Sequence, residues 1–115
     1  MSEWNKFFKN LDSYADTTIS GRDNYVSWTL GDLLKSPTGW NSPNSGSSNS
    51  TGFSAMGGGW RYPSGGFTSI YNDCAFWNST ISTDTYDIFL TVRDSHVGKN
   101  LWDKKSGFSV RCLKD

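Results

Sequence analysis

The chain has 115 residues, which suits one domain with a single core and is too short for two ordinary domains. Eleven Lys and Arg residues balance eleven Asp and Glu residues, so the formal net charge is zero, without the basic excess typical of nucleic-acid or membrane-surface binding. No apolar run approaches the roughly 20 residues that cross a bilayer, and the first residues lack the charged and apolar regions of a signal peptide. We therefore expect no nucleic-acid partner and no membrane insertion.

Aromatic residues make up 16% of the chain and include six Trp, although only 35% of the residues are hydrophobic and twelve are Gly. Disordered, Ser-rich chains are poor in aromatic residues, so this composition indicates a folded domain. Because aromatic side chains supply most of the apolar bulk, a small fold rich in strands or loops is favoured over a helical bundle. The Trp residues suit either a small core or a binding surface.

Two helical patterns open the chain. In residues 2–15, five apolar side chains recur at the spacing of one helical face: Trp4, Phe7, Phe8, Leu11 and Ala15. Ser2 is available as the N-cap of this helix. Residues 24–35 fit a shorter helix that runs into an extended stretch, although Gly31 weakens the helical pattern.

Residues 36–51 consist almost entirely of Ser, Asn, Pro, Thr and Gly, interrupted by Trp40. The flanking segments are too short to fold separately, so we expect a long loop within one domain, pinned by Trp40, rather than a linker. The glycines at 57–59 and 65–66 indicate turns and close backbone approach.

The rest of the chain favours strands. Residues 75–77 form a short apolar run, and residues 108–113 alternate in a final strand. In residues 86–92, one face of a predicted strand carries Tyr86, Ile88, Leu90 and Val92. Helices followed by short strands predict an α+β fold that forms one domain over residues 1–115.

Residues able to support catalysis are scarce. His96 is the single His, no Ser lies in a Gly-x-Ser-x-Gly motif, and no two carboxylates have the spacing of a catalytic pair. Cys74 and Cys112 are too few for a zinc site or a disulfide framework, and a disulfide between them remains open. We expect no catalytic residue, no metal site and no cofactor.

A ligand site needs an aromatic surface beside side chains that hydrogen-bond in fixed geometry. Residues 71–73, 84–89 and 93–102 supply that mixture. We predict that the ligand is bound by Tyr71, Asn72, Asp73, Asp87, Phe89, Arg93 and Trp102. Phe89 falls on the polar side of its predicted strand, and Trp102 adjoins a charged run. The alternative for each segment is an ordinary loop, because Asn and Asp also hydrogen-bond their own backbone.

Four motifs follow one another in a familiar order. They are residues 34–40 (LKSPTGW), 52–61 (GFSAMGGGWR), 76–80 (FWNST) and 107–113 (GFSVRCL). In order and spacing they resemble the Fibrobacter succinogenes major paralogous (FISUMP) domain, a likeness that covers residues 33–115 and that the first helix extends to the start.

The resemblance implies a C-type lectin-like α+β fold, in which two helices flank a twisted, mostly antiparallel sheet with long loops. It also implies a bacterial protein that is secreted, surface-anchored or lipoprotein-associated. Four aromatic residues are assigned to the scaffold by the same resemblance, namely Trp40, Trp60, Trp77 and Phe108. The aromatic candidates for a ligand are then Tyr71, Phe89 and Trp102.

Two departures from the family pattern add expectations. The family's Cys-Pro-x-Gly-Trp-His-x-Pro-like first strand is absent before the first helix, so we expect either a fragment of the domain or a family member shortened at its N-terminus. The open sheet edge would then be covered by a loop, a neighbouring domain or a second copy. Leu101 and Trp102 replace polar residues of the family, which indicates a contact surface or a patch over the missing strand.

The function expected from the resemblance is extracellular, non-catalytic adhesion, in which the chain binds a glycan or a surface protein. One alternative is a structural end domain of a larger surface or fimbrial protein, with Phe89 and Trp102 packed against a neighbour. Another is a receptor-binding domain diversified by a retroelement over residues 71–102. Calcium is not expected, because the Glu-Pro-Asn and Trp-Asn-Asp motifs of animal lectins are absent.

Overall fold

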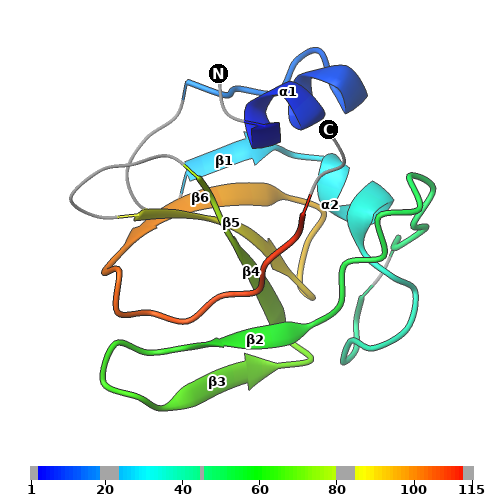
Figure 1. The fold of residues 1–115 in the computed structure, drawn as a ribbon. Helices are drawn as coiled ribbons and strands as arrows, with labels where there is room; N and C mark the ends of the chain where they lie inside the picture. Colours follow the sequence, from blue (N-terminus) through cyan, green and yellow to red (C-terminus); the bar gives the residue numbers. More distant parts are fainter. Residues whose placement is uncertain (1–2, 19–23, 45, 80–84, 113–115) are drawn as a thin grey trace.

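Two helices and six strands form within residues 3–18, 24–44, 46–79 and 85–112, the part of the chain that the computed structural model describes (Figure 1). Their order is α1 (Glu3–Leu11), β1 (Asn24–Ser27), α2 (Leu30–Leu34), β2 (Gly58–Arg61), β3 (Phe67–Ile70), β4 (Asp73–Trp77), β5 (Thr85–Thr91) and β6 (Val97–Trp102). The domain is therefore compact and α+β, as predicted. Neither helix is long and apolar enough to span a membrane.

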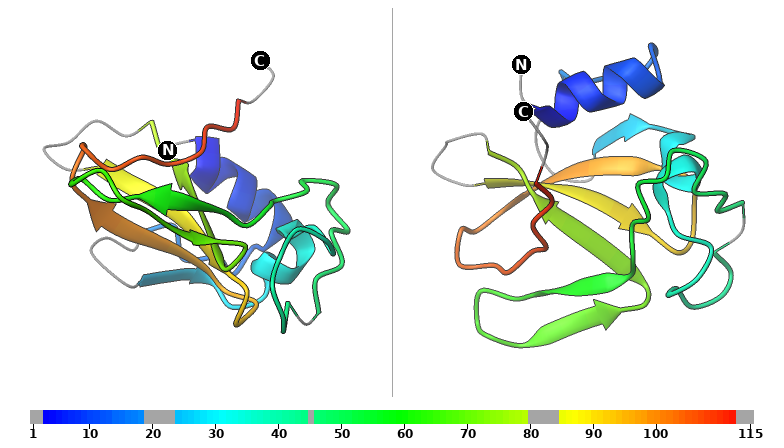
Figure 2. Two further views of the ribbon diagram at one scale, coloured as in Figure 1. Left: turned by 90° about the horizontal axis from the view of Figure 1, so that it is seen from below. Right: turned by 45° about the vertical axis from the view of Figure 1, so that its right-hand side comes forward.

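The strands form one mixed sheet in the order β1-β6-β5-β4-β2-β3. Neighbours are antiparallel except β2 and β4, which are parallel and meet at Gly59 and Cys74. This agrees with the predicted mostly antiparallel sheet. Helix α1 lies across one face of the sheet. Helix α2 lies at the side of the sheet, next to the long loop that follows it (Figures 1 and 2).

Helix α1 confirms the first helical pattern but is shorter than residues 2–15. Phe8 is fully buried, with Glu3 in the first turn and Lys9 in the last, where they complement the helix dipole. The helix ends at Leu11 because the Asp12 side chain accepts a hydrogen bond from the Tyr14 N–H (2.9 Å) and so favours a turn.

The prediction for residues 24–35 is wrong in its order: strand β1 comes first and helix α2 follows. The residues of β1 pair with β6, which local sequence does not reveal. The turn between the two elements is closed by Ser27, whose Oγ accepts a hydrogen bond from the Leu30 N–H (3.2 Å). Leu30 and Leu34 of α2 are completely buried.

The long loop is internal to the domain and is pinned by Trp40, as predicted. The indole N–H of Trp40 donates to the carbonyl of Ala55 (2.9 Å), and the Ser36 N–H donates to the same carbonyl (2.9 Å). These bonds tie the start of the loop to its end. A flexible linker would lack such contacts.

Strands β2, β3 and β6 were not predicted, whereas β4 and β5 confirm the apolar run at 75–77 and the alternation at 86–92. The predicted turn at 65–66 joins β2 to β3. Gly59 has a φ of 67°, and a Cβ there would lie 2.3 Å from the Thr68 carbonyl, so only glycine fits. Gly59 therefore shows the close backbone approach predicted for this glycine run, although it lies in a strand.

The final strand predicted at 108–113 is not present in its described part, and Leu113 lies outside the described residues. Gly107 and Ser109 form single bridges to Arg61 and Phe76, and no strand continues beyond them among the described residues. Val110 is 72% exposed and Cys112 is exposed. Alternating apolar residues are thus insufficient here, because no strand within the described ranges pairs with Val110 or Cys112, and neither residue is buried.

The core lies between the helices and one face of the sheet. Alternation along β5 places Ile88 and Leu90 on this face, where they are 0% and 1% exposed, as predicted. The buried cluster comprises Phe8, Ala15, Val26, Leu30, Leu34, Phe53, Ala55, Cys74, Phe76, Ile88, Leu90 and Val97. Burial of each large side chain contributes about 1.5–3 kcal/mol to stability, so this face holds the domain together.

Candidate functional site

Four of the seven residues predicted to bind a ligand lie near one end of β4 and β5. Tyr71 and Asn72 form the turn before β4, and Arg93 follows β5. The Val92 N–H donates to the Asn72 carbonyl (2.8 Å), which brings the two turns together. Tyr71 is 51% exposed and Arg93 is exposed, but Asp73 is buried at the start of β4.

Two further predicted residues, Asp87 and Phe89, lie within β5. Phe89 is on the face opposite the core, as its alternation predicts, but it is half-buried rather than exposed. Its register neighbours, Ala75 and Gly98, are small and leave room for the ring between the flanking strands. The side chain of Asp87 lies outside the described part of the structure.

Trp102 is at the other end of the sheet from Arg93. It pairs with Thr85 at the start of β5, and the seven residues of β5 span about 20 Å. The Trp102 ring is half-buried, with its centroid 4.8 Å from that of Trp60. The structure therefore brings Tyr71, Asn72 and Arg93 together and leaves Trp102 apart.

A different group of rings is exposed where β1 ends and β6 begins. Trp28 is 64% exposed and Tyr25 is 38% exposed, and both pack against His96. The ring centroids of Trp28 and Tyr25 lie 4.3 and 4.5 Å from that of His96 and 5.3 Å from each other. We call Tyr25, Trp28 and His96 the aromatic platform.

Backbone contacts from three elements hold the platform in place. Ser27 at the end of β1 pairs with Val97 at the start of β6. The Ser95 hydroxyl donates to the Trp28 carbonyl (2.6 Å), and the Gly31 N–H donates to the Ser95 carbonyl (2.8 Å). Strand β1, helix α2 and the turn between β5 and β6 are thereby joined at the platform.

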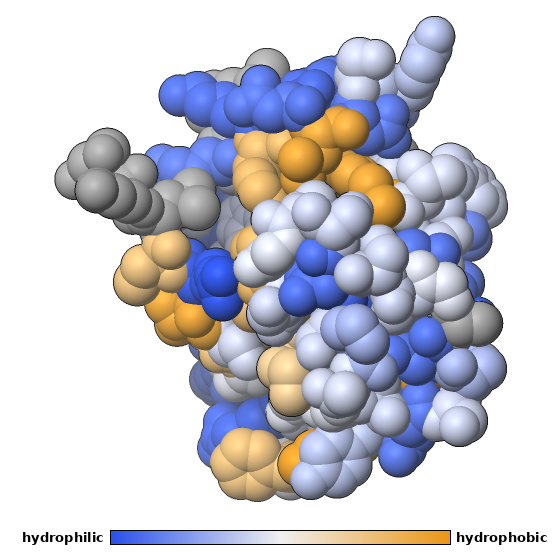
Figure 3. Space-filling model, turned by 90° about the vertical axis from the view of Figure 1, so that its right-hand side faces the viewer, coloured by the Kyte–Doolittle hydropathy of each residue, from blue (hydrophilic) through white to orange (hydrophobic). Residues whose placement is uncertain are grey.

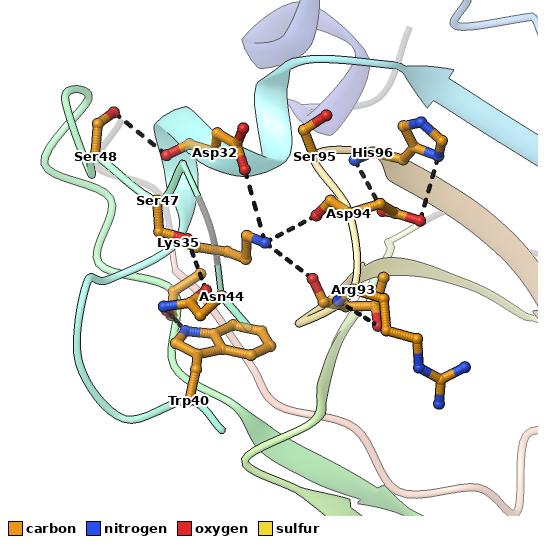
Figure 4. Close-up of polar contacts among 12 residues, drawn as sticks. Asp32, Lys35, Trp40, Asn44, Ser47, Ser48, Arg93, Asp94, Ser95 and His96 are labelled. Atoms are coloured by element: carbon orange, nitrogen blue, oxygen red, sulfur yellow. Dashed lines mark hydrogen bonds and ion pairs between the residues drawn. The ribbon is translucent and has the colours of Figure 1, made fainter. Parts of the chain in front are cut away.

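Asp94 supplies a carboxylate at the edge of the platform and faces His96 (Figure 4). Asp94 Oδ1 accepts a hydrogen bond from the His96 N–H (3.0 Å). The Nδ1 of His96 lies 3.4 Å from Asp94 Oδ2, an ion-pair distance when the imidazole is protonated, but the geometry is not that of a hydrogen bond. Arg93, in the same turn, adds an exposed guanidinium. Asp94 thus gives the platform a hydrogen-bond acceptor at its edge, while the Arg93 side chain extends away from His96 (Figure 4).

A buried lysine, Lys35, binds the backbone of the turn that carries Asp94. The Nζ of Lys35 donates to the carbonyls of Thr91 (3.0 Å) and Asp94 (2.8 Å) and lies 3.8 Å from Asp32 Oδ1 (Figure 4). Its side chain is completely buried. Burial lowers the pKa of Lys35, while the carboxylates of Asp32 and Asp94 oppose this shift. Lys35 is therefore a structural cation that ties α2 to the turn carrying the platform.

A separate cavity of about 360 Å³ lies between α1 and the C-terminal segment. It is lined by Glu3, Trp4, Phe7, Phe53, Trp77, Asn78, Ser79, Val110 and Arg111. The Trp4 indole N–H donates to the Trp77 carbonyl (3.0 Å), and the Arg111 guanidinium lies 4.5 Å from the centroid of the Phe53 ring. Trp4 and Phe7 also pack against the core. These aromatic side chains hold α1 to the domain, whereas the platform rings extend beyond the core.

The described residues contain no group of three or more His, Cys, Asp or Glu side chains arranged to hold a metal ion.

Sequence reasoning missed Tyr25, Trp28, Asp94 and His96 as site residues. The spacing of Asp94 and His96 could have indicated a binding site, but it is equally typical of a turn. Tyr25 and Trp28 lie in an apolar segment that resembles a helix with a core face. Only the pairing of β1 with β6 brings the two segments together.

The fold and the platform define a small α+β domain that presents aromatic side chains at one end of a mixed sheet. The family model of the Fibrobacter succinogenes major domain matches residues 1–114, and the chain belongs to this family. The match confirms the resemblance carried by the four sequence motifs. No curated protein and no solved structure shows significant similarity to the chain.

Proposed function

We propose that the chain is a non-catalytic module that binds a glycan on the aromatic platform. The observation that carries this proposal is the indole of Trp28, which is 64% exposed although Tyr25 and His96 support it. An exposed Trp forgoes the stabilisation of burial, so an ordered and exposed Trp suits a binding surface.

The chemistry of a sugar matches that of the platform. One face of a pyranose ring consists of C–H groups, which pack against an aromatic ring, and its hydroxyls both donate and accept hydrogen bonds. The carboxylate of Asp94 offers an acceptor at the edge of the platform. Because the platform rings are already packed together, binding immobilises few additional side chains.

We also place the module outside the cell or at the bacterial cell surface and assign it a C-type lectin-like fold. Family membership and the sequence resemblance support both statements. The two helices, the mixed sheet and the long loop after α2 are consistent with that fold. Because one fold serves many functions, the ligand is argued from the platform alone.

A glycan array probed with the folded, labelled chain tests the proposal, followed by titration calorimetry with the best glycan. The Trp28→Ala variant should weaken binding at least about tenfold, because it removes the stacking surface. Its melting temperature should change little, since most of the side chain is exposed.

The matched control is Tyr14→Ala, which removes an aromatic ring that is 94% exposed and lies outside the platform. Its glycan affinity should equal that of the wild type. The proposal fails if the folded protein binds no glycan, or if Trp28→Ala and Tyr14→Ala bind a glycan equally well. A protein ligand captured by the same surface and lost in Trp28→Ala would favour the alternative of surface-protein recognition.

A further inference from the structure

The cavity between α1 and the C-terminal segment has the size and composition of a small-molecule site. Its volume of about 360 Å³ lies within the usual range for such sites, and four of its nine lining residues are aromatic. They come from α1, from the loop before β2 and from the end of β4: Trp4, Phe7, Phe53 and Trp77. Figure 3 shows apolar side chains at the surface just below the polar layer at the top of the molecule, the level of α1 in Figure 1. The cavity therefore offers a ligand mainly flat, apolar contact surface.

Contacts behind the aromatic rings hold the walls of the cavity in place. The Trp4 ring packs on Phe8 and on Phe76, with ring centroids 5.6 Å apart in both pairs. The Trp77 ring lies 4.7 Å from that of Phe108, centroid to centroid. Because these walls are already ordered, a ligand that enters the cavity immobilises few additional side chains, which favours binding.

Arg111 supplies the positive charge of the cavity lining. It lies in the C-terminal segment, which passes beside the start of α1 (Figure 2). Its guanidinium is 4.5 Å from the centroid of the Phe53 ring, a cation–π contact that provides no oxygen acceptor for its N–H groups. Within residues 3–18, 24–44, 46–79 and 85–112, no oxygen forms a hydrogen bond or an ion pair with this guanidinium. These donors are therefore available to an anionic group of a ligand.

Glu3 limits the charge that such a ligand can carry. A backbone hydrogen bond and a bond from the Ser79 hydroxyl (2.9 Å) lower the pKa of Glu3, so its carboxylate is ionised at neutral pH. One negative charge on the ligand can pair with Arg111, whereas a second would be repelled by Glu3. A carboxylate carries a single charge and has two oxygens that match the fork of a guanidinium, while a phosphate monoester carries nearly two charges.

We propose that this cavity binds a small molecule that has one flat apolar ring and one carboxylate. The ring packs between the aromatic walls, and the carboxylate accepts hydrogen bonds from Arg111 at the exposed side of the cavity, next to Val110. At roughly 30 Å³ for one water molecule, the cavity has the room of about twelve waters, which suits a ligand the size of phenylacetate. No residue of the aromatic platform lines the cavity, so this site is separate from the one proposed for a glycan.

An NMR titration of the isotope-labelled chain with phenylacetate, up to about 10 mM, tests the proposal. The indole N–H of Trp4 and the backbone N–H groups of Asn78 and Val110 should shift saturably, because these residues line the cavity. The dissociation constant should lie between about 10 μM and about 1 mM, as expected for so small a ligand. Phenylacetamide has the same ring without the charge and should bind at least about tenfold more weakly.

Arg111→Gln should raise the dissociation constant of phenylacetate at least about tenfold and change that of phenylacetamide by less than about twofold. The matched control is Arg93→Gln, which removes an exposed guanidinium outside the cavity and should leave the affinity for phenylacetate unchanged. Both arginines are exposed, so the melting temperature should be nearly unchanged in either variant.

The proposal is overturned if phenylacetate causes no saturable shift, or if the shifts lie only outside the cavity. Equal affinities of Arg111→Gln and Arg93→Gln for phenylacetate would overturn it as well. The titration contains no glycan, and Trp28→Ala should bind phenylacetate as the wild type does, because Trp28 does not line the cavity. Its result is therefore independent of glycan binding on the platform.

Discussion

Lys35 shows how a single residue can join distant parts of this domain. Lysine is rarely buried unless its charge is paired, and here its ammonium group has two backbone carbonyls and a nearby carboxylate as partners. Those partners come from α2 and from the segment after β5. The residue therefore contributes to the position of the turn that carries Asp94 and His96.

Replacing Lys35 with Met should destabilise the domain by about 2–4 kcal/mol, because the carbonyls of Thr91 and Asp94 lose their donor and Asp32 loses its cation. Urea denaturation at neutral pH measures the effect. Lys104→Met is the control, since Lys104 is exposed and should change stability by less than about 0.5 kcal/mol. Equal effects of the two substitutions would contradict the assigned role.

The difference in stability between the wild type and Lys35→Met should grow in alkaline solution. Burial lowers the pKa of Lys35 in the folded chain, so the unfolded chain binds more protons between that lowered pKa and about 10.4. The contribution of this group to the free energy of unfolding therefore rises with pH in that window, and Met has no such contribution. Urea denaturation of both proteins across the alkaline range checks the sign, and a constant or shrinking difference would contradict it.

At the scale of elements, α2 illustrates a conflict between local preference and packing. Glycine disfavours helix by about 1 kcal/mol relative to Ala, and Gly31 lies within a helix of five residues. A Cβ at this position would lie 2.7 Å from the Ser95 carbonyl oxygen and 2.8 Å from that of His96. Close approach of α2 to the platform turn requires the glycine.

Gly31→Ala should consequently destabilise the domain by about 1–3 kcal/mol, the usual cost of overpacking, although helix propensity alone predicts a gain. Thermal and urea denaturation give the sign directly. Gly66→Ala serves as control, because the nearest atom to its added Cβ is a Tyr62 ring carbon at an ordinary 3.8 Å. A stabilising effect of Gly31→Ala would show that α2 and the turn are not packed as described.

The accuracy of prediction from sequence varies by element for a physical reason. The pattern of α1 and the alternation of β5 are strong, since each element places one regular face on the core. No strand was predicted specifically at β6, because Gly98, Lys99 and Asn100 give no apolar alternation, although the strand is paired on both sides. Lys99 can be buried there because its Nζ donates to the Thr17 carbonyl (3.2 Å).

At the scale of the whole molecule, the two cysteines occupy different environments. Cys74 is buried in β4 within the core, and Cys112 is exposed beyond the end of the sheet. The structure has no disulfide between the two, the pairing that the sequence left open.

A thiol reagent such as DTNB should label one cysteine per native chain and two after denaturation, because Cys74 is 1% exposed. Cys112→Ser should abolish the native reaction and leave the melting temperature of the non-reduced protein unchanged. Absence of labelling until a reductant is added would instead indicate a disulfide and contradict this arrangement.

The sequence by itself determined the family, the α+β class and the internal position of the long loop. These conclusions rest on motifs and on periodicity, which are local properties of the chain. Of the binding residues it proposed, the structure brings Tyr71, Asn72 and Arg93 near one another and sets Trp102 at the other end of the sheet.

Only the tertiary structure decided which aromatic side chains reach the surface. Trp60 and Trp102 pack against each other, while Trp28 extends from the core with Tyr25 and His96 around it. The decisive contacts join β1 to β6 and α2 to the turn after β5, segments far apart in the chain. Exposure of a ring depends on what packs over it, and that is a property of the assembled sheet, which no local pattern contains.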